Sequence, residues 1–189
     1  MYELFMLSKL MHRPMHGYLL QSILNSAIGP FRKVSWGTLY PLIKKLEQAG
    51  YIAAVEKHDD PRGKKLYRTT KEGRKRFLAL VSERGAFDAD SPDSFSLKVG
   101  CFGHLESALR LAILKDYRDY LDQVLAHSAA MENRLWLESS LPEQERRFAL
   151  LALEHRKTIV KAETRWIDAL IGNPERFMTR GENAGPATT

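Results

Sequence analysis

The residues best suited to binding a partner lie in the segment SWGTLYPLIKKLEQAG, residues 35–50. Trp36, Tyr40 and Lys44 recur every four residues, so a helix would place them on one side. The apolar residues expected to hold this helix to a core are Leu39, Leu42, Ile43 and Leu46. Hydroxyl and ammonium groups donate to phosphate oxygens, so the outer side is suited to a polyanion. Half-buried core packing of Trp36 and Tyr40 is the alternative interpretation.

Other residues around this helix extend the candidate nucleic-acid surface. A helix N-terminus attracts anions, and Gly37 lets the backbone approach another surface closely. A basic turn, HDDPRGK, follows further along the chain and supplies more cations. The remaining candidate contacts are Ser35, Gly37, Thr38, Pro41 and Lys45 on the helix, and Arg62, Lys64 and Lys65 at the turn.

The chain shows no pattern of residues that predicts catalysis or a metal site. His12 and His16 are four residues apart, but Arg13-Pro14 would break a helix between them. Cys101 is the single cysteine, and a buried inert thiol is its commoner role. A Ser–His–Asp grouping, a phosphate-cradling glycine loop and a dinucleotide fingerprint are all missing from the sequence. We therefore expect a non-enzymatic protein with no cofactor and no bound metal.

The charge of the chain is divided unevenly along its 189 residues. Residues 1–84 carry 16 Lys or Arg against 7 Asp or Glu, whereas residues 85–189 carry 13 against 16. A basic first half suits a polyanionic partner, although a solvated surface alone could also account for it. The N-terminus lacks the pattern of a signal peptide, no apolar run would span a bilayer, and one cysteine allows no internal disulfide. These features lead us to expect a cytoplasmic protein.

The elements that must position these residues follow from hydrophobic spacing and from breakers. We predict helices over 1–12, 15–27 and about 35–50, two strands within 51–57 and 64–70, and a helix over 71–84 capped by Thr70. The order helix, helix, helix, hairpin, helix is that of a winged helix-turn-helix, in which the third helix enters the major groove. We predict this domain over 1–84, and the polar residues 85–94 as a linker.

The second half is expected to be a helical domain over 95–172, followed by a flexible tail over 173–189. Two long helices, 103–137 and 142–170, carry apolar stripes close to heptad spacing. Such faces need a partner, and the helices could pack on each other or on a second copy. The candidate dimerisation residues are Leu105, Leu109, Leu121, Phe148, Ile159 and Trp166. The predicted fold class is therefore mainly α with a small β-hairpin, a winged helix-turn-helix followed by a helical dimerisation domain.

Three spaced segments, MHGYLLQSI, WGTLYPLIKKLEQAGYI and RGKKLYRTTKEGR, resemble the PadR family of bacterial transcription regulators. DSFSLKVGCF resembles the start of the longer C-terminal domain found in one branch of that family. The resemblance implies a homodimeric repressor that binds an inverted-repeat operator. It matches Tyr18, the recognition-helix residues Thr38, Tyr40 and Pro41, and the wing residues 62–65. Trp36 departs from the family's usual small residue or proline, and Thr69 from its usual leucine.

The resemblance also implies release of the DNA by a small molecule, for which an aromatic or phenolic compound is the candidate. Aromatic residues of the second half could line its site, although each could equally belong to a core: Phe95, Phe102, Tyr117, Trp136 and Trp166. A different class of function is a winged helix that docks a protein and binds no specific DNA. The excess of cations in residues 1–84 favours the DNA-binding interpretation over this alternative.

Overall fold

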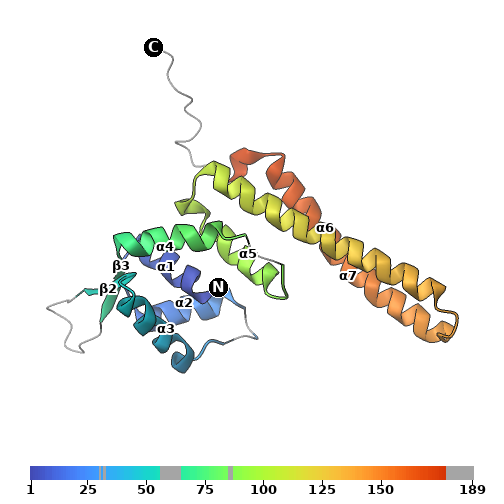
Figure 1. Ribbon diagram of the computed structural model, residues 1–189, viewed down its shortest axis with the longest axis horizontal. Coiled ribbons are helices and arrows are strands. Elements are labelled where there is room, and N and C mark those ends of the chain that lie inside the picture. Colours follow the sequence, from blue (N-terminus) through green and yellow to red (C-terminus); the bar gives the residue numbers. More distant parts are fainter. Residues whose placement is uncertain (30, 32, 56–64, 85–86, 178–189) are drawn as a thin grey trace, which may run out of the picture. The chain divides into compact units, whose positions relative to one another are not determined.

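The structure is a computed structural model that describes residues 1–29, 31, 33–55, 65–84 and 87–177 (Figure 1). The chain forms two compact units, Met1–His104 and Leu105–Thr189, and each is described by itself. The predicted linker, 85–94, falls within the first unit, and its last residues already belong to a helix. Residues 174–176 of the predicted tail form a short 3-10 helix, η2, and the tail from 178 lies outside the described residues.

The first unit is a winged helix with the predicted order of its main elements. Its elements are α1 (Tyr2–His12), β1 (Met15–His16), α2 (Gly17–Ala27), α3 (Trp36–Gln48), β2 (Ile52–Val55), β3 (Leu66–Thr69), α4 (Lys71–Ser82), α5 (Ser91–Val99) and the 3-10 helix η1 (Phe102–His104). The predicted mainly helical fold with a β-hairpin is thus confirmed. Figure 1 shows α1 to α4 gathered beside this hairpin, β2 and β3.

The sheet contains a third strand that the sequence did not predict. Its order is β1-β3-β2, all antiparallel, with Met15 opposite Tyr67 and His16 opposite Leu66. Residues 15 and 16 were assigned to the start of the second helix, but the extended backbone after Arg13-Pro14 continues through them. A ring nitrogen of His16 contacts the carbonyl oxygen of Lys65 at 3.1 Å, which fastens this short strand to β3.

The ends of α3 are fixed by side-chain and backbone chemistry that the sequence encodes. Ser35 caps the start, because its Oγ accepts from the Thr38 N–H at 3.1 Å. At the other end Gly50 has a φ of +71°, and the Tyr51 N–H donates to the Leu46 carbonyl at 2.9 Å. This is the Schellman arrangement, which glycine adopts without steric cost. The helix therefore begins and ends where its outer residues can form one continuous face.

A single core holds the winged helix together. Leu39, Ile43 and Leu46 of α3 are buried, as the spacing predicted, and Leu42 is only half-buried. They belong to a buried set drawn from α1 to α4, the three strands and the loop before α3: Phe5, Met6, Leu7, Leu10, Met15, Leu20, Leu24, Val34, Ile52, Tyr67, Phe77 and Val81. Burying side chains of this size stabilises the fold by about 1.5 to 3 kcal/mol each. The buried residues of α3 all lie on one side of the helix, so the core holds α3 by that side.

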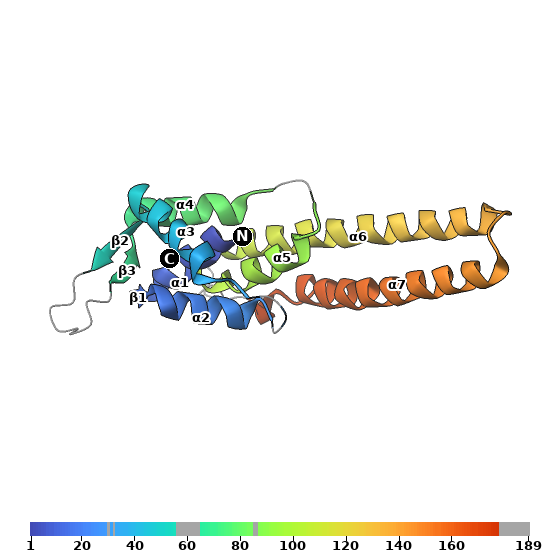
Figure 2. The same cartoon turned by 90° about the horizontal axis from the view of Figure 1, so that it is seen from below.

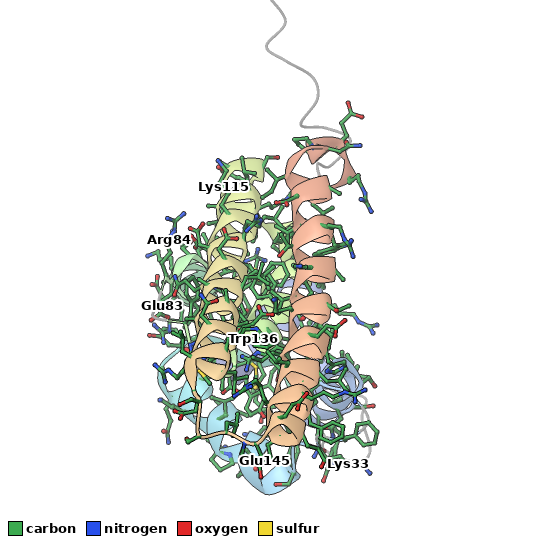
Figure 3. The ribbon with its side chains drawn as sticks, turned by 90° about the vertical axis from the view of Figure 1, so that its right-hand side faces the viewer. Lys33, Glu83, Arg84, Lys115, Trp136 and Glu145 are labelled. Atoms are coloured by element: carbon green, nitrogen blue, oxygen red, sulfur yellow. The ribbon has the colours of Figure 1, made fainter. Side chains whose placement is uncertain are left out.

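The second unit is an antiparallel helical hairpin of α6 (Ser107–Leu137) and α7 (Glu143–Ile171), which run side by side in Figures 1 and 2. Lys157 Nζ lies 2.6 Å from Glu132 Oε2, and Arg118 Nε lies 2.8 Å from Asp168 Oδ1. Figure 3 shows Lys115 toward the start of α6 and Trp136 toward its end. Among the described residues, no helix has the length and apolarity that crossing a membrane requires.

The helix α7 carries two stripes at heptad spacing on opposite faces. The inner stripe is buried or half-buried: Leu150, Leu153, Lys157, Val160, Thr164, Ile167 and Ile171. The outer stripe is exposed: Phe148, Ala152, His155, Ile159, Ala162, Trp166 and Ala169. On α6 one heptad stripe is buried or half-buried: Arg110, Leu114, Tyr117, Leu121, Val124, Ser128, Met131 and Leu135. Packing within the hairpin thus buries or half-buries the α6 stripe and the inner stripe of α7, and it leaves the outer stripe of α7 exposed.

Candidate nucleic-acid interface

The outer face of α3 and the start of α2 together carry a row of three aromatic rings. The rings of Tyr18 and Trp36 stack with centroids 4.6 Å apart and planes inclined by 11°. Trp36 and Tyr40 follow with centroids 5.7 Å apart and planes inclined by 41°. Tyr18 is 61% exposed and Tyr40 is 44% exposed, so both hydroxyls belong to the surface of the unit. The ring of Trp36 therefore links Tyr18 of α2 to Tyr40 of α3.

Trp36 itself is half-buried, and the reason is a glycine beneath it. A Cβ atom on Gly17 would lie 2.5 Å from Cη2 of Trp36 and 3.0 Å from Cδ1 of Ile43. No side chain fits between these groups, so the indole covers the Gly17 backbone at the start of α2. Tyr40 is exposed, as the DNA-contact interpretation requires. Trp36 is half-buried, which is closer to the core-packing interpretation.

Lys44 continues the row and is held in place by two neighbours. Its Nζ lies 5.7 Å from the centre of the Tyr40 ring and 3.3 Å from Oε2 of Glu47. The hydrogen bond to Glu47 and the charge of that carboxylate raise the pKa of Lys44, which therefore stays cationic. Its ammonium has three donor protons, so further acceptors can still bind to it.

The remaining predicted residues of α3 also lie at its exposed start and outer side. Ser35, Gly37, Thr38, Pro41 and Lys45 are all exposed. The Ser35 and Thr38 hydroxyl oxygens lie 3.0 Å apart, so each orients the other. Because Pro41 has no N–H, the Gly37 carbonyl receives no intrahelical hydrogen bond from position 41. This end of α3 presents polar groups and the positive end of the helix dipole.

The predicted wing contacts are described only in part. Lys65 is exposed beside the sheet, whereas Arg62 and Lys64 lie outside the described residues. Arg68 is an exposed cation on β3 that was not among the predicted contacts. Strand alternation around the buried Tyr67 could have identified it, because its neighbours in a strand must face the other side of the sheet. Lys65 and Arg68 thus place two cations on the described part of the hairpin.

The candidate effector residues do not converge within one unit. Phe95 and Phe102 belong to the first unit, and Tyr117, Trp136 and Trp166 belong to the second. Tyr117 and Trp136 lie on the same continuous helix, and their 19-residue separation spans about 28 Å. Tyr117 is buried, its ring is stacked on Tyr120, and its hydroxyl donates to Glu163 at 3.3 Å. One small molecule could therefore contact Tyr117 or Trp136 of a chain, and not both.

The candidate dimerisation residues divide into buried and exposed groups. Leu105 and Leu121 are buried and Leu109 is half-buried in the single chain. Phe148, Ile159 and Trp166 are 57%, 50% and 44% exposed, and all three belong to the outer stripe of α7. The exposed group lies on the surface of the single chain, and the buried group is packed within it.

Comparisons with known proteins identify the first unit by sequence. Residues 6–79 match the model of the transcriptional regulator PadR-like family. None of the curated proteins shows a significant similarity to the chain. Among solved structures, Bacillus subtilis PadR in complex with operator DNA is 20% identical and covers 90% of this chain and 96% of its own, with a TM-score of 0.42.

Two further structures show a similar degree of likeness. The Vibrio cholerae virulence activator AphA is 20% identical and covers 94% of this chain and 100% of its own, with a TM-score of 0.40. Bacillus subtilis PadR in complex with p-coumaric acid is 19% identical, with coverages of 90% and 96% and a TM-score of 0.40. These likenesses are too low for a structural argument, whereas the sequence match spans α2, α3 and the hairpin. Residues 6–79 are thus similar to the PadR-like family of transcriptional regulators, and this match covers less than half of the chain.

Proposed function

We propose that the protein is a cytoplasmic, homodimeric transcription regulator that represses genes by binding an inverted-repeat operator. The observation that carries this proposal is the continuous row of Tyr18, Trp36, Tyr40 and Lys44 on the outer face of α3 and the start of α2. The core holds α3 from its other side, so the row is free to enter a major groove. The match of residues 6–79 to a family of transcriptional regulators supports the same conclusion.

The contacts of one winged helix with DNA follow from the donors on its surface. The hydroxyls of Tyr18 and Tyr40 and the ammonium of Lys45 donate to phosphates along the groove, which fixes the depth of α3. Thr38 and the exposed start of α3 lie where base edges are read. Lys65 and Arg68 of the hairpin add contacts to neighbouring phosphates. Affinity then depends steeply on salt, because each phosphate contact releases counterions.

The exposed outer stripe of α7 supports a dimer. The outer stripe of α7 extends over about six turns of helix and exposes Phe148, Ile159 and Trp166. Apolar residues at heptad spacing pack well against an equivalent helix, and a two-fold axis makes the same stripe complementary to itself. Two copies joined in this way would present two α3 helices to half-sites about 34 Å apart on one side of the duplex.

Regulation by a small molecule would act on this spacing. A ligand that binds better to a dimer with misplaced α3 helices shifts the population away from the DNA-binding form. An aromatic compound bound to the second unit could do so, and Tyr117 and Trp166 are candidate contacts on its two helices. We test this with phenolic acids as probes, by measuring whether they release bound operator.

The experiment for the central proposal is a fluorescence-anisotropy titration against DNA from upstream of the protein's own gene. Unrelated competitor DNA is present, and the salt concentration is varied. Specific binding that survives competitor, with two chains for each site, supports a dimeric regulator. Weak binding that competitor abolishes contradicts it, and then the protein-docking alternative would be tested instead.

A further inference from the structure

We infer that Trp36 is a positioning residue, which fills the space over Gly17 and holds Tyr18 and Tyr40 as a pre-formed pair of phosphate donors. The inference deepens the proposed DNA binding and rests on it. Trp36 lies between the two tyrosines, with ring centroids 4.6 Å from one and 5.7 Å from the other. The tyrosine rings come from α2 and α3, so only a group between them can fix their relative position.

The indole is suited to this role by how it is held. Ser35, the N-cap of α3, immediately precedes Trp36. The six-membered ring of the indole packs on the backbone of Gly17. Ile43, which is fully buried, lies close to the same point. The indole therefore contacts the core through its six-membered ring, stacks on Tyr18, and packs at a tilt against Tyr40. Tyr18, at 61% exposed, has little other packing to restrain it.

A fixed pair of donors binds more tightly than two free ones. Each tyrosine that is ordered only on binding costs rotamer entropy, and a ring already stacked has lost that freedom beforehand. The ring centres of Tyr18 and Tyr40 lie at most 10.3 Å apart, as the two measured separations require. Two exposed tyrosines in one row can both donate to phosphates of one strand. Lys44, over the outer face of Tyr40, restrains the far end of the row.

The first test needs no DNA. The full-length protein is labelled with 3-fluorotyrosine, and the ¹⁹F signal of Tyr18 is assigned by its loss in Tyr18→Phe. We expect Trp36→Ala to shift that signal, because the stacked indole no longer shields the ring. Gly17→Ala should shift it in the same direction, since the new methyl group displaces the indole. A Tyr18 signal unchanged in Trp36→Ala overturns the inference.

The second test measures affinity for operator DNA in a mutant cycle. Tyr18→Phe and Tyr40→Phe keep both rings and remove the donors, and each should weaken binding about tenfold. Trp36→Ala should weaken binding of the unmodified protein by a similar factor. In the Tyr18→Phe/Tyr40→Phe background it should cost less than about twofold, because there are no hydroxyls left to position. An equal loss in both backgrounds would mean that Trp36 touches DNA itself.

A conservative variant separates positioning from general damage to the fold. Trp36→Phe keeps a ring between the tyrosines but ends short of Gly17, so it should bind operator within about threefold of the unmodified protein. Gly17→Ala should then weaken binding more when Trp36 is present than in Trp36→Phe, where the close contact with Ile43 is the one that remains. Equal effects of Gly17→Ala in the two backgrounds contradict the proposed contact.

The two levels of the hypothesis can fail separately. If the unmodified protein binds no duplex at low salt, the proposed function is wrong and this inference falls with it. If the protein binds operator while Trp36→Ala binds it equally well, the function stands and only the positioning role is overturned. Thermal melts of each variant accompany the titrations, and an affinity loss counts only when the melting temperature is retained.

Discussion

His12 and His104 form a residue-scale contact whose protonation can be tested directly. Their Nε2 atoms lie 2.9 Å apart and their ring centroids 4.2 Å apart. One ring must donate and the other must accept, so the contact cannot survive protonation of both. Burial, then the charges of His12, Arg74 and Lys9, lower the pKa of His104, and a backbone hydrogen bond at Ser8 opposes them. The edge of the Phe77 ring completes these surroundings.

We therefore expect stability to fall as the pH drops below about 6.5. The ordinary pKa of histidine, 6.5, applies in the unfolded chain, and the folded value is lower. In this window the unfolded chain binds a proton that the folded chain does not, so acid favours unfolding. The melting temperature should fall between about pH 7.5 and about pH 5.5, and His104→Asn should reduce that fall. His127→Asn, at an exposed position of α6, is the control, and parallel curves for all three proteins would contradict the assignment.

Residue-scale features of the candidate DNA-binding face were only partly predictable. Four-residue spacing placed Trp36, Tyr40 and Lys44 on one side of α3, which the structure confirms through their ring and cation contacts. The stacking of Tyr18 on Trp36 was not predictable, because the two residues lie 18 positions apart and meet only after α2 and α3 pack. The glycine that admits the indole belongs to this tertiary contact as well.

At the scale of elements, Thr70 joins the turn after α3 to the start of α4. Its Oγ1 accepts from the Gly73 N–H at 3.0 Å and donates to the Gly50 carbonyl at 2.6 Å. We expect Thr70→Ala to destabilise the first unit by about 1 kcal/mol, the usual cost of losing an N-cap. Urea unfolding measures this change. Thr158→Ala on α7, whose hydroxyl bonds only within its own helix, is the control and should leave the midpoint nearly unchanged.

The elements proposed to contact DNA should be distinguishable by the salt dependence of binding. Lys45 on α3 and Lys65 beside β3 are both exposed. If each neutralises one phosphate, Lys45→Ala and Lys65→Ala should each reduce the slope of log affinity against log salt by about 0.9. Anisotropy titrations at several salt concentrations give this slope. Lys161→Ala, an exposed change on α7, should leave the slope unaltered, and unaltered slopes for all three variants would place the DNA elsewhere.

Element prediction succeeded where periodicity was long and failed where it was short. The long helices and the main strands were predicted from spacing, but β1 has two residues and α5 has nine, with no buried residue. Neither element is long enough for its hydrophobic periodicity to be recognised in the sequence. On α7 the heptad stripe predicted from Phe148 to Trp166 is real, yet it faces away from α6. Spacing reveals that a stripe exists, and only packing reveals which of two stripes the neighbouring helix covers.

At the scale of the whole molecule, the outer stripe of α7 gives a test of the proposed dimer. We expect Ile159→Glu to convert a dimer into a monomer, because two carboxylates would be buried at a self-complementary interface. Light scattering coupled to size-exclusion chromatography measures the mass in solution. Thr158→Glu introduces the same charge at the adjacent exposed position and should leave the mass unchanged. An unmodified protein with the mass of one chain would refute the dimer.

The same variant connects assembly to DNA recognition. If the dimer sets the separation of two α3 helices, a monomer binds one half-site and loses the contribution of the second. Ile159→Glu should therefore bind an inverted repeat no better than a single half-site, although its α3 residues are intact. A variant that stays monomeric yet retains full operator affinity would assign recognition to one chain.

The two opposed stripes of α7 also constrain how this protein can change over evolutionary time. Deleting one residue from a helix turns everything beyond the deletion by about 100°, which would misalign the inner and outer stripes together. Deleting seven residues restores both faces almost completely, provided that α6 loses the same length. Substitutions can accumulate at single positions of this hairpin, but its length should change among descendants in heptad steps. Gene lineages that carry other hairpin lengths should also have rebuilt one of the two faces.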